Sequence, residues 1–212
     1  MGIGPGLGWG LLAIVMLTLL IAYVVLQETR AHYHWRGLVA QGDVTAIRSL
    51  LSGALDSWRT GRPPRGVPAN IWSAVQTAQL VDTGGDYARL STGVEGQYAM
   101  VDGLRKEVSS SFDEAVKVAQ TLGDMLLYNV PDLQIPRIQI DIYSTFRDAD
   151  QRPEQQCVLS SIIDRSTAAA FDWDAAAAES FVETFECRYE VNESGVALPV
   201  QPLDVARTEA KT

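Results

Sequence analysis

The sequence predicts an α+β protein: one N-terminal transmembrane helix, a helical stem, and an α+β sandwich built on an antiparallel sheet. Three observations favour this class. An uncharged apolar run opens the chain, short alternating strand patterns are joined by turn signals, and amphipathic helical patterns lie among them. The expected organisation is a Gly-rich tail at 1–9, the transmembrane helix at 10–26, a basic stem with a Pro-rich connector at 27–68, an α+β domain at 69–200, and a flexible tail at 201–212.

The run at 10–26 is predicted to be an uncleaved membrane anchor. No charged side chain occurs before Glu28, and the 18 residues from Trp9 to Leu26 would form a helix about 27 Å long. A cleavable signal peptide is the rival interpretation, but it needs a basic start and a shorter apolar run. The predicted anchor residues are Trp9, Leu11, Leu12, Ile14, Val15, Leu19, Leu20, Ile21, Val24, Val25 and Leu26.

The residues after this run predict a membrane-interface belt and an orientation. Arginines flank the run on its C-terminal side alone, so the positive-inside rule places the following domain in the cytoplasm and makes the lipid bilayer a partner. His32 and His34 lie two residues apart, and on a helix they would point to different faces and could not share a metal ion. The predicted interface residues are Arg30, His32, Tyr33, His34, Trp35 and Arg36.

Charge is distributed unevenly along the chain. Through Arg65 the net charge is +3, and from Gly66 onward it is −12, within a total of −9. A domain this acidic repels nucleic acid, so nucleic-acid binding is not expected. The 14 arginines against 3 lysines suggest a GC-rich, bacterial source.

Two helices and a connector are predicted in the stem region. Asp43 is a suitable N-cap for a helix from Val44 to Trp58, whose apolar residues recur at spacings of three and four. The segment from Thr60 to Pro68 contains three prolines and two glycines and cannot continue a helix. A second helix is expected over 69–80.

The next part of the chain predicts three short strands and a helix. The strands are expected over 87–94, 97–101 and 104–108, and Asp102-Gly103 between the last two is a hairpin signal. Ser111 followed by Glu114 three residues later fits a capping box, which predicts a helix that ends near Asn129.

The remaining elements are predicted from alternation. Isoleucines at 138, 140 and 142 alternate with polar residues, so 137–146 is the clearest strand, and 156–163 is its expected hairpin partner. An alanine-rich helix at 174–184 is followed by strands at 185–191 and 196–200.

Candidate chemistry in the domain is sparse. Both histidines lie before residue 35, so a Ser-His-Asp or Cys-His catalytic site within the domain is excluded by composition. No cofactor or metal site is expected. Arg137, Asp141 and Asp164 form a candidate polar site, provided that the polar faces of their strands coincide.

The two cysteines, Cys157 and Cys187, fall in predicted strands. Two thiols lack the further ligands that zinc requires, so zinc is not expected. Buried thiols that pack as small apolar groups are the first interpretation, because a cytoplasmic domain keeps its thiols reduced. A Cys157–Cys187 disulfide is the alternative, and it would accompany a domain outside the membrane.

The functional hypothesis is an anchored domain that acts by binding, as an accessory subunit, scaffold or assembly factor with a protein partner. It follows from the anchor, the acidic domain and the missing catalytic groups. The alternative is a tethered enzyme or small-ligand binder that uses the carboxylates and arginines of the candidate polar site.

Overall fold

A computed structural model describes residues 5–101, 103–147, 150–173, 175, 177–193 and 195–207, without the side chains of 5–11, 13, 28–35, 101 and 105. Its helices are α1 (Pro5–Ala40), α2 (Val44–Thr60), α3 (Ala69–Gln76), α4 (Ser111–Tyr128), α5 (Arg165–Ala168) and α6 (Ala178–Thr184). Its strands are β1 (Gln79–Thr83), β2 (Tyr87–Gly93), β3 (Gln97–Val101), β4 (Leu104–Ser109), β5 (Arg137–Arg147), β6 (Pro153–Asp164), β7 (Glu186–Val191) and β8 (Ala197–Leu198).

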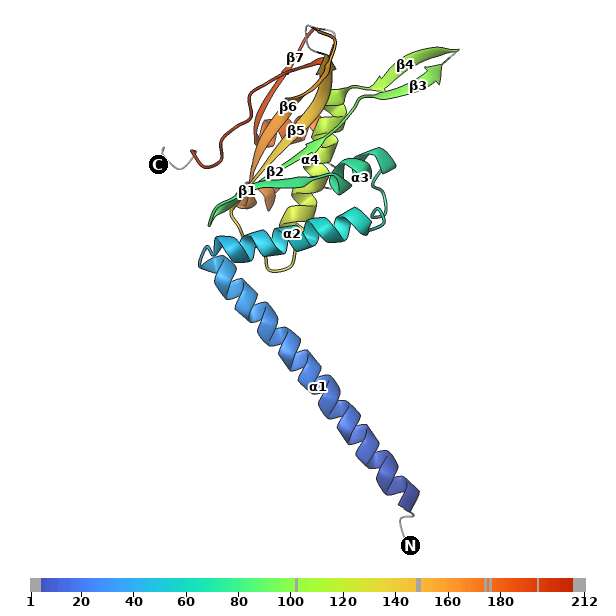
Figure 1. The fold of residues 1–212 in the computed structure, drawn as a ribbon, viewed down its shortest axis with the longest axis vertical. Coiled ribbons are helices and arrows are strands. Elements are labelled where there is room, and N and C mark those ends of the chain that lie inside the picture. Colours follow the sequence, from blue (N-terminus) through green and yellow to red (C-terminus); the bar gives the residue numbers. More distant parts are fainter. Residues whose placement is uncertain are drawn as a thin grey trace.

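The main sheet is mixed, in the order β1-β2-β5-β6-β7-β8. Strands β2 and β5 run parallel, whereas the other neighbours are antiparallel. The protein is therefore α+β as predicted, but the predicted purely antiparallel sheet is wrong. The physical reason is the connection: a parallel pair needs a crossover, and here α4 makes it by lying across the sheet (Figure 1).

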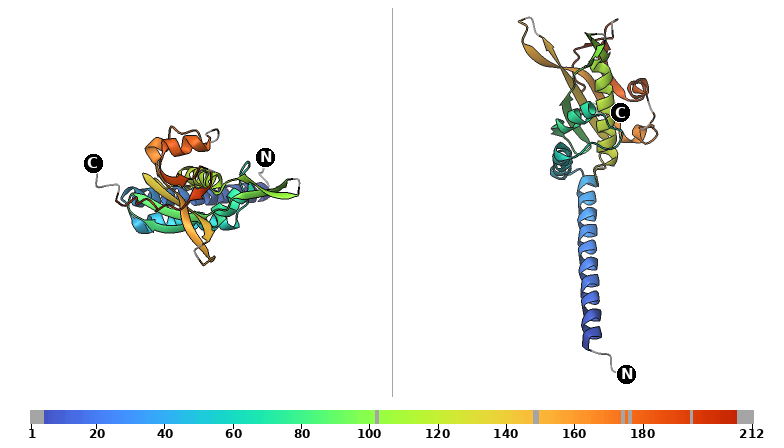
Figure 2. Two further views of the ribbon diagram at one scale, coloured as in Figure 1. Left: turned by 90° about the horizontal axis from the view of Figure 1, so that it is seen from above. Right: turned by 90° about the vertical axis from the view of Figure 1, so that its right-hand side faces the viewer.

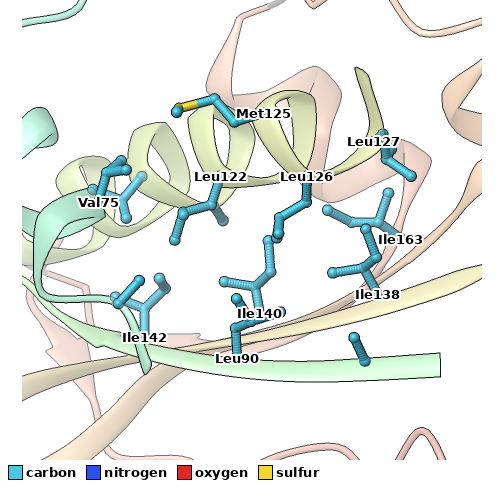
Figure 3. Close-up of a cluster of buried hydrophobic side chains, with 14 of the residues drawn as sticks. Val75, Leu90, Leu122, Met125, Leu126, Leu127, Ile138, Ile140, Ile142 and Ile163 are labelled. Atoms are coloured by element: carbon cyan, nitrogen blue, oxygen red, sulfur yellow. The ribbon is translucent and has the colours of Figure 1, made fainter. Parts of the chain in front are cut away.

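One face of the sheet, which we call the front face, packs against α4 and carries the core. Leu122 and Leu126 of α4 lie over Leu90 of β2 and over Ile138 and Ile140 of β5 (Figure 3). All five side chains are completely buried. The alternating isoleucines of β5 thus all point to this face, as the sequence predicted, and so its polar residues point to the opposite, back face.

The predicted capping box of α4 is displaced by one residue. Ser110 is the N-cap, and its hydroxyl accepts a hydrogen bond from the amide of Asp113 at 3.1 Å. Asp113 in turn accepts a bond from the Ser110 amide at 3.1 Å. Glu114 is instead buried, where Asn70, Ser109 and Lys117 donate hydrogen bonds to its carboxylate. Ser110 with Asp113 and Ser111 with Glu114 both have the spacing of a capping box. The first pair forms the box, because Glu114 is buried and bonded elsewhere.

The stem helices follow the sequence closely. The side chain of Asp43 accepts hydrogen bonds from the amides of Thr45 and Ala46 at 2.8 and 3.1 Å, which confirms it as the N-cap of α2. The second predicted helix is shorter than expected, because α3 ends at Gln76 and the chain continues into the edge strand β1.

Helix α1 extends away from the rest of the protein (Figures 1 and 2). Spanning a membrane takes about 20 predominantly apolar residues in one helix. No helix in the part of the chain that the structure describes is both long enough and apolar enough for this. This finding contradicts the predicted transmembrane helix at 10–26, and with it the predicted single-pass membrane location and the cytoplasmic placement derived from its flanking arginines.

The predicted anchor and interface residues all fall within α1. Leu12, Ile14, Val15, Leu19, Leu20, Ile21, Val24, Val25 and Leu26 are exposed. The side chains of Trp9, Leu11, Arg30, His32, Tyr33, His34 and Trp35 lie outside the described ones. Arg36 was predicted to face a bilayer, but its Nε donates to Asp132 Oδ1 at 2.5 Å. The charge of the buried Asp132 side chain is therefore compensated by Arg36, near the C-terminal end of α1.

Candidate functional site

A network of four buried or half-buried polar side chains lies on the back face of the sheet. Asp141 is completely buried and accepts hydrogen bonds from Ser160 Oγ at 2.5 Å, Arg89 Nε at 2.7 Å and Gln139 Nε2 at 2.9 Å. We call Arg89, Gln139, Asp141 and Ser160 the polar network. A buried carboxylate is tolerated only when it is paired and hydrogen-bonded, and these three donors meet that condition.

Strand register brings the network together. Gln139 and Asp141 are two residues apart on β5 and so share a face. Arg89 on β2 is the direct neighbour of Gln139, and Ser160 on β6 is the direct neighbour of Asp141. Three adjacent strands therefore each contribute a polar group at one point of the back face.

Asp141 raises the pKa of two groups close to it, Arg89 and Tyr143. Burial by itself lowers the pKa of Arg89, but the hydrogen bond and the charge of Asp141 outweigh it, so the pKa is raised. The pKa of Tyr143 is raised by burial and by the nearby Asp141. Arg89 therefore stays charged and Tyr143 stays neutral through the physiological range, and the site holds one compensated ion pair.

Residues 199–207, which we call the strap, cross the back face over this network. Gln139 Nε2 donates to the Leu203 carbonyl at 2.7 Å, and its Oε1 accepts from the Val205 amide at 2.9 Å. The Leu203 amide donates to Ser160 Oγ at 2.9 Å. Arg137 adds a bond to the Val205 carbonyl at 3.3 Å. The side chains of the polar network and of Arg137 thus bind the backbone of the strap at Leu203 and Val205.

The strap is held at its start as well. Arg188 NH1 donates to the carbonyls of Gln201 and Pro202 at 3.2 and 3.4 Å, and the Val200 amide donates to the Cys157 carbonyl at 2.8 Å. The sequence predicted a flexible tail from residue 201, whereas Leu203 and Val205 are buried. Alternation of Leu203 and Val205 was the available signal, but two apolar residues are too few to predict a docked segment.

The apolar contacts of the strap are separate from the main core. Leu203 and Val205 pack with Ile162 and against Tyr87 in a small cluster of their own. Burying a Leu or Val side chain is worth roughly 1.5–3 kcal/mol. The strap is thus held by modest apolar burial together with hydrogen bonds from the sheet.

The predicted polar site does not form as one site. Arg137 and Asp164 are direct neighbours across β5 and β6, but Arg137 forms an ion pair with Asp86 and Asp164 is exposed. Asp141 lies four residues further along β5 and pairs with Arg89. The sequence did not indicate Arg89 as a functional residue. An arginine at a partly exposed position of a strand does not reveal which carboxylate it will pair with.

Both cysteines are free, so the disulfide alternative is not formed. Cys187 is the direct neighbour of Ser161 and packs against the core on the front face. Cys157 is the neighbour of Tyr143 and lies near Asp141 on the back face. Burial raises the pKa of each thiol from about 9 to about 12.

These pKa values predict that native Cys157 and Cys187 resist alkylation at pH 8, whereas both react once the protein is unfolded in guanidinium, because the thiolate is the nucleophile. Mass spectrometry after iodoacetamide treatment measures this. Since each folded pKa exceeds the unfolded value, the stabilisation is complete below about pH 9 and is lost as the pH rises towards 12. Rapid labelling of the folded protein at pH 8 would contradict the burial.

A cavity of about 380 Å³ opens at the far end of β2, between α3 and the start of α4. Its lining includes Glu114, Asn70, Gln97 and Tyr143. The Glu114 carboxylate is already bonded to Asn70, Ser109 and Lys117. Among the described residues, no group of three or more His, Cys, Asp or Glu side chains is placed to hold a metal ion.

The β3–β4 hairpin, which we call the arm, projects away from the main sheet as a separate two-stranded sheet (Figures 1 and 2). The strands pair from Gln97 with Ser109 to Val101 with Leu104, which confirms the hairpin predicted from Asp102-Gly103. Gly103 has a φ of 76°, the left-handed conformation that this turn requires. Among the side chains of the arm that the structure describes, large apolar ones are exposed, with exposed fractions of 51% for Tyr98, 71% for Met100, 70% for Leu104 and 61% for Val108.

Comparisons with protein-family models, with curated proteins and with solved structures found no match.

Proposed function

We propose that the protein is a binding module, an accessory subunit, scaffold or assembly factor, that contacts a protein partner through the arm. The observation that carries this proposal is the exposure of Met100, Leu104 and Val108 on a projecting hairpin. Met100 is paired with Arg105, the residue after Leu104, so Met100 and Leu104 lie on opposite faces of the arm, and both faces present an exposed apolar side chain. Single exposed apolar residues are ordinary on protein surfaces, but apolar side chains on both faces of a projecting hairpin support an interaction site.

The geometry of the arm supports a protein as the partner. Each of its strands pairs only with the other in the described structure, so each has an outer edge with backbone groups available for pairing. Such edges are templates for strand addition by another chain. Methionine also suits a contact surface, because its unbranched side chain adapts to the shape of the partner.

Substitution of Met100 and Leu104 by aspartate tests the proposal. Wild-type protein purified by affinity from its source cells is expected to bring a stoichiometric protein partner, and Met100→Asp/Leu104→Asp is expected to lose at least nine-tenths of it. Loss of a central apolar contact costs about 2 kcal/mol or more of binding free energy. Two charges introduced there are therefore expected to weaken binding by more than tenfold. Retention is measured by quantitative mass spectrometry.

Val81→Asp is the matched control, because Val81 is 50% exposed but lies on the edge strand β1, away from the arm. It is expected to retain the partner, and all three proteins should unfold at the same denaturant concentration. The proposal fails if the wild type is a monodisperse monomer without a partner, or if the arm variant retains the partner as well as Val81→Asp does.

A further inference from the structure

We infer that the back face under the strap is a binding site for a peptide with two apolar residues two positions apart, and that the strap is its resident occupant. This site is distinct from the arm and does not depend on the function proposed for it. The ligand is a segment of a partner protein that replaces residues 203–205 on the polar network.

The contacts of the strap are those of peptide recognition. Gln139 uses both ends of its amide on the backbone of the strap, and Ser160 accepts from a third backbone group. Gln139 and Ser160 are themselves completely buried. Backbone groups are the same in every peptide, so these contacts accept any segment that can adopt the backbone conformation of the strap, which enters a turn between Asp204 and Arg207.

Selectivity comes from two side chains of that segment. Leu203 and Val205 point into the small cluster with Ile162, which requires apolar residues two positions apart. Asp204 between them is exposed and forms an ion pair with Arg207 at 3.3 Å, within the strap itself. The two apolar positions therefore define the ligand.

The site can open without loss of the core. The apolar contacts of the strap form a cluster separate from the one under α4. The surface left behind would carry the polar groups of Arg89, Gln139, Asp141 and Ser160, which water can satisfy, beside the apolar side chains of Ile162 and Tyr87.

Space for a longer ligand adjoins the strap. A cavity of about 370 Å³ lies beside residues 199–202, lined by Tyr143, Glu154, Gln155, Gln156 and Cys157 as well. A segment that enters here would continue directly onto the polar network. The cavity is thus the place where a competing peptide can bind before the strap has left.

Hydrogen exchange on the wild-type protein tests whether the strap detaches. The amides of Leu203 and Val205, which donate to Ser160 and Gln139, are expected to exchange at least a hundredfold faster than those of Ile140 and Leu159 in the central strands. Equal rates in the two groups would mean that the strap leaves only on global unfolding, and the inference would be wrong.

Peptide binding tests the recognition itself. The probe is a fluorescein-labelled peptide of residues 198–207, and the receptor is the full-length variant Leu203→Ser/Val205→Ser, whose own strap is weakened. The variant is expected to bind the probe at least tenfold more tightly than the wild type, in which the tethered strap competes at a millimolar effective concentration. Fluorescence polarisation measures both affinities.

A control probe defines the sequence requirement. A peptide with serine in place of both Leu203 and Val205 is expected not to bind. A folded variant that binds neither probe, or binds both equally, overturns the inference. So does a wild type that is dimeric where the variant is monomeric, because the strap would then be exchanged between two copies of this chain.

Discussion

Replacing Arg89 with leucine is expected to lower the free energy of unfolding by about 3 kcal/mol, because it leaves a buried charge without its counter-ion. Asp141 is completely buried, and of the three hydrogen-bond donors described for it Arg89 is the charged one. Ser160 and Gln139 would remain, but neutral donors compensate a carboxylate less well than a guanidinium. Urea denaturation followed by circular dichroism measures the change.

Arg59→Leu is the matched control for this prediction. Arg59 also pairs with a carboxylate, that of Asp56 at 2.7 Å, but the two side chains are 48% and 68% exposed. Exposed pairs contribute about 0.2–1 kcal/mol, so the midpoint of this variant should hardly move. If the two variants lose the same stability, Arg89 does not compensate the charge of Asp141 and our account of the polar network is wrong.

Phe181→Ala is expected to cost about 3–5 kcal/mol, because it removes a completely buried ring and leaves a cavity. Phe181 lies in α6, with its ring centroid 5.0 Å from that of Phe185 and 6.1 Å from that of Phe171. Phe171 in turn contacts Trp173 at 5.0 Å. These rings attach α6 to the side of α4, so the substitution should also reduce the near-ultraviolet circular dichroism signal.

Phe112→Ala provides the comparison. Phe112 is half-buried, and its ring centroid lies 4.8 Å from that of Tyr189. An aromatic pair of this kind contributes about 1 kcal/mol beyond its area. The loss in free energy of unfolding should be larger for Phe181→Ala than for Phe112→Ala. A loss no larger than that of Phe112→Ala would show that the segment around α6 closes over the cavity left by the ring.

Local patterns predicted the elements better than their arrangement. The strand at 137–146, the Asp43 cap and the pairing of the strands on either side of Asp102-Gly103 were each predicted from neighbouring residues, and each forms as expected. The parallel pairing of β2 with β5 depends on where α4 lies, which no local pattern specifies. The short β1 was missed for a similar reason, since its residues read as the end of a helix until the sheet offers β2 as a partner.

The polar network likewise depends on an arrangement of strands that local patterns do not specify. Asp141 was a candidate from its sequence position alone, but it was grouped with Arg137 and Asp164, whereas its cation comes from β2. Alternation in β5 predicted one apolar face and one polar face, but alternation does not show what covers each face. The strap covers the polar face of β5. Its two buried apolar residues, Leu203 and Val205, are too few to predict this from the sequence.

The sequence by itself determined the α+β class, the positions of most helices and strands, the front face of β5, and the lack of a histidine in the domain. Tertiary structure decided the mixed sheet, the partner of Asp141, the burial of the strap and the projection of the arm. The physical reason is range: propensity, capping and periodicity act within a few residues, whereas strand order and the cover of a face depend on segments far apart in the chain. No helix among the described residues is long and apolar enough to span a membrane, which contradicts the anchor predicted from the run at 10–26.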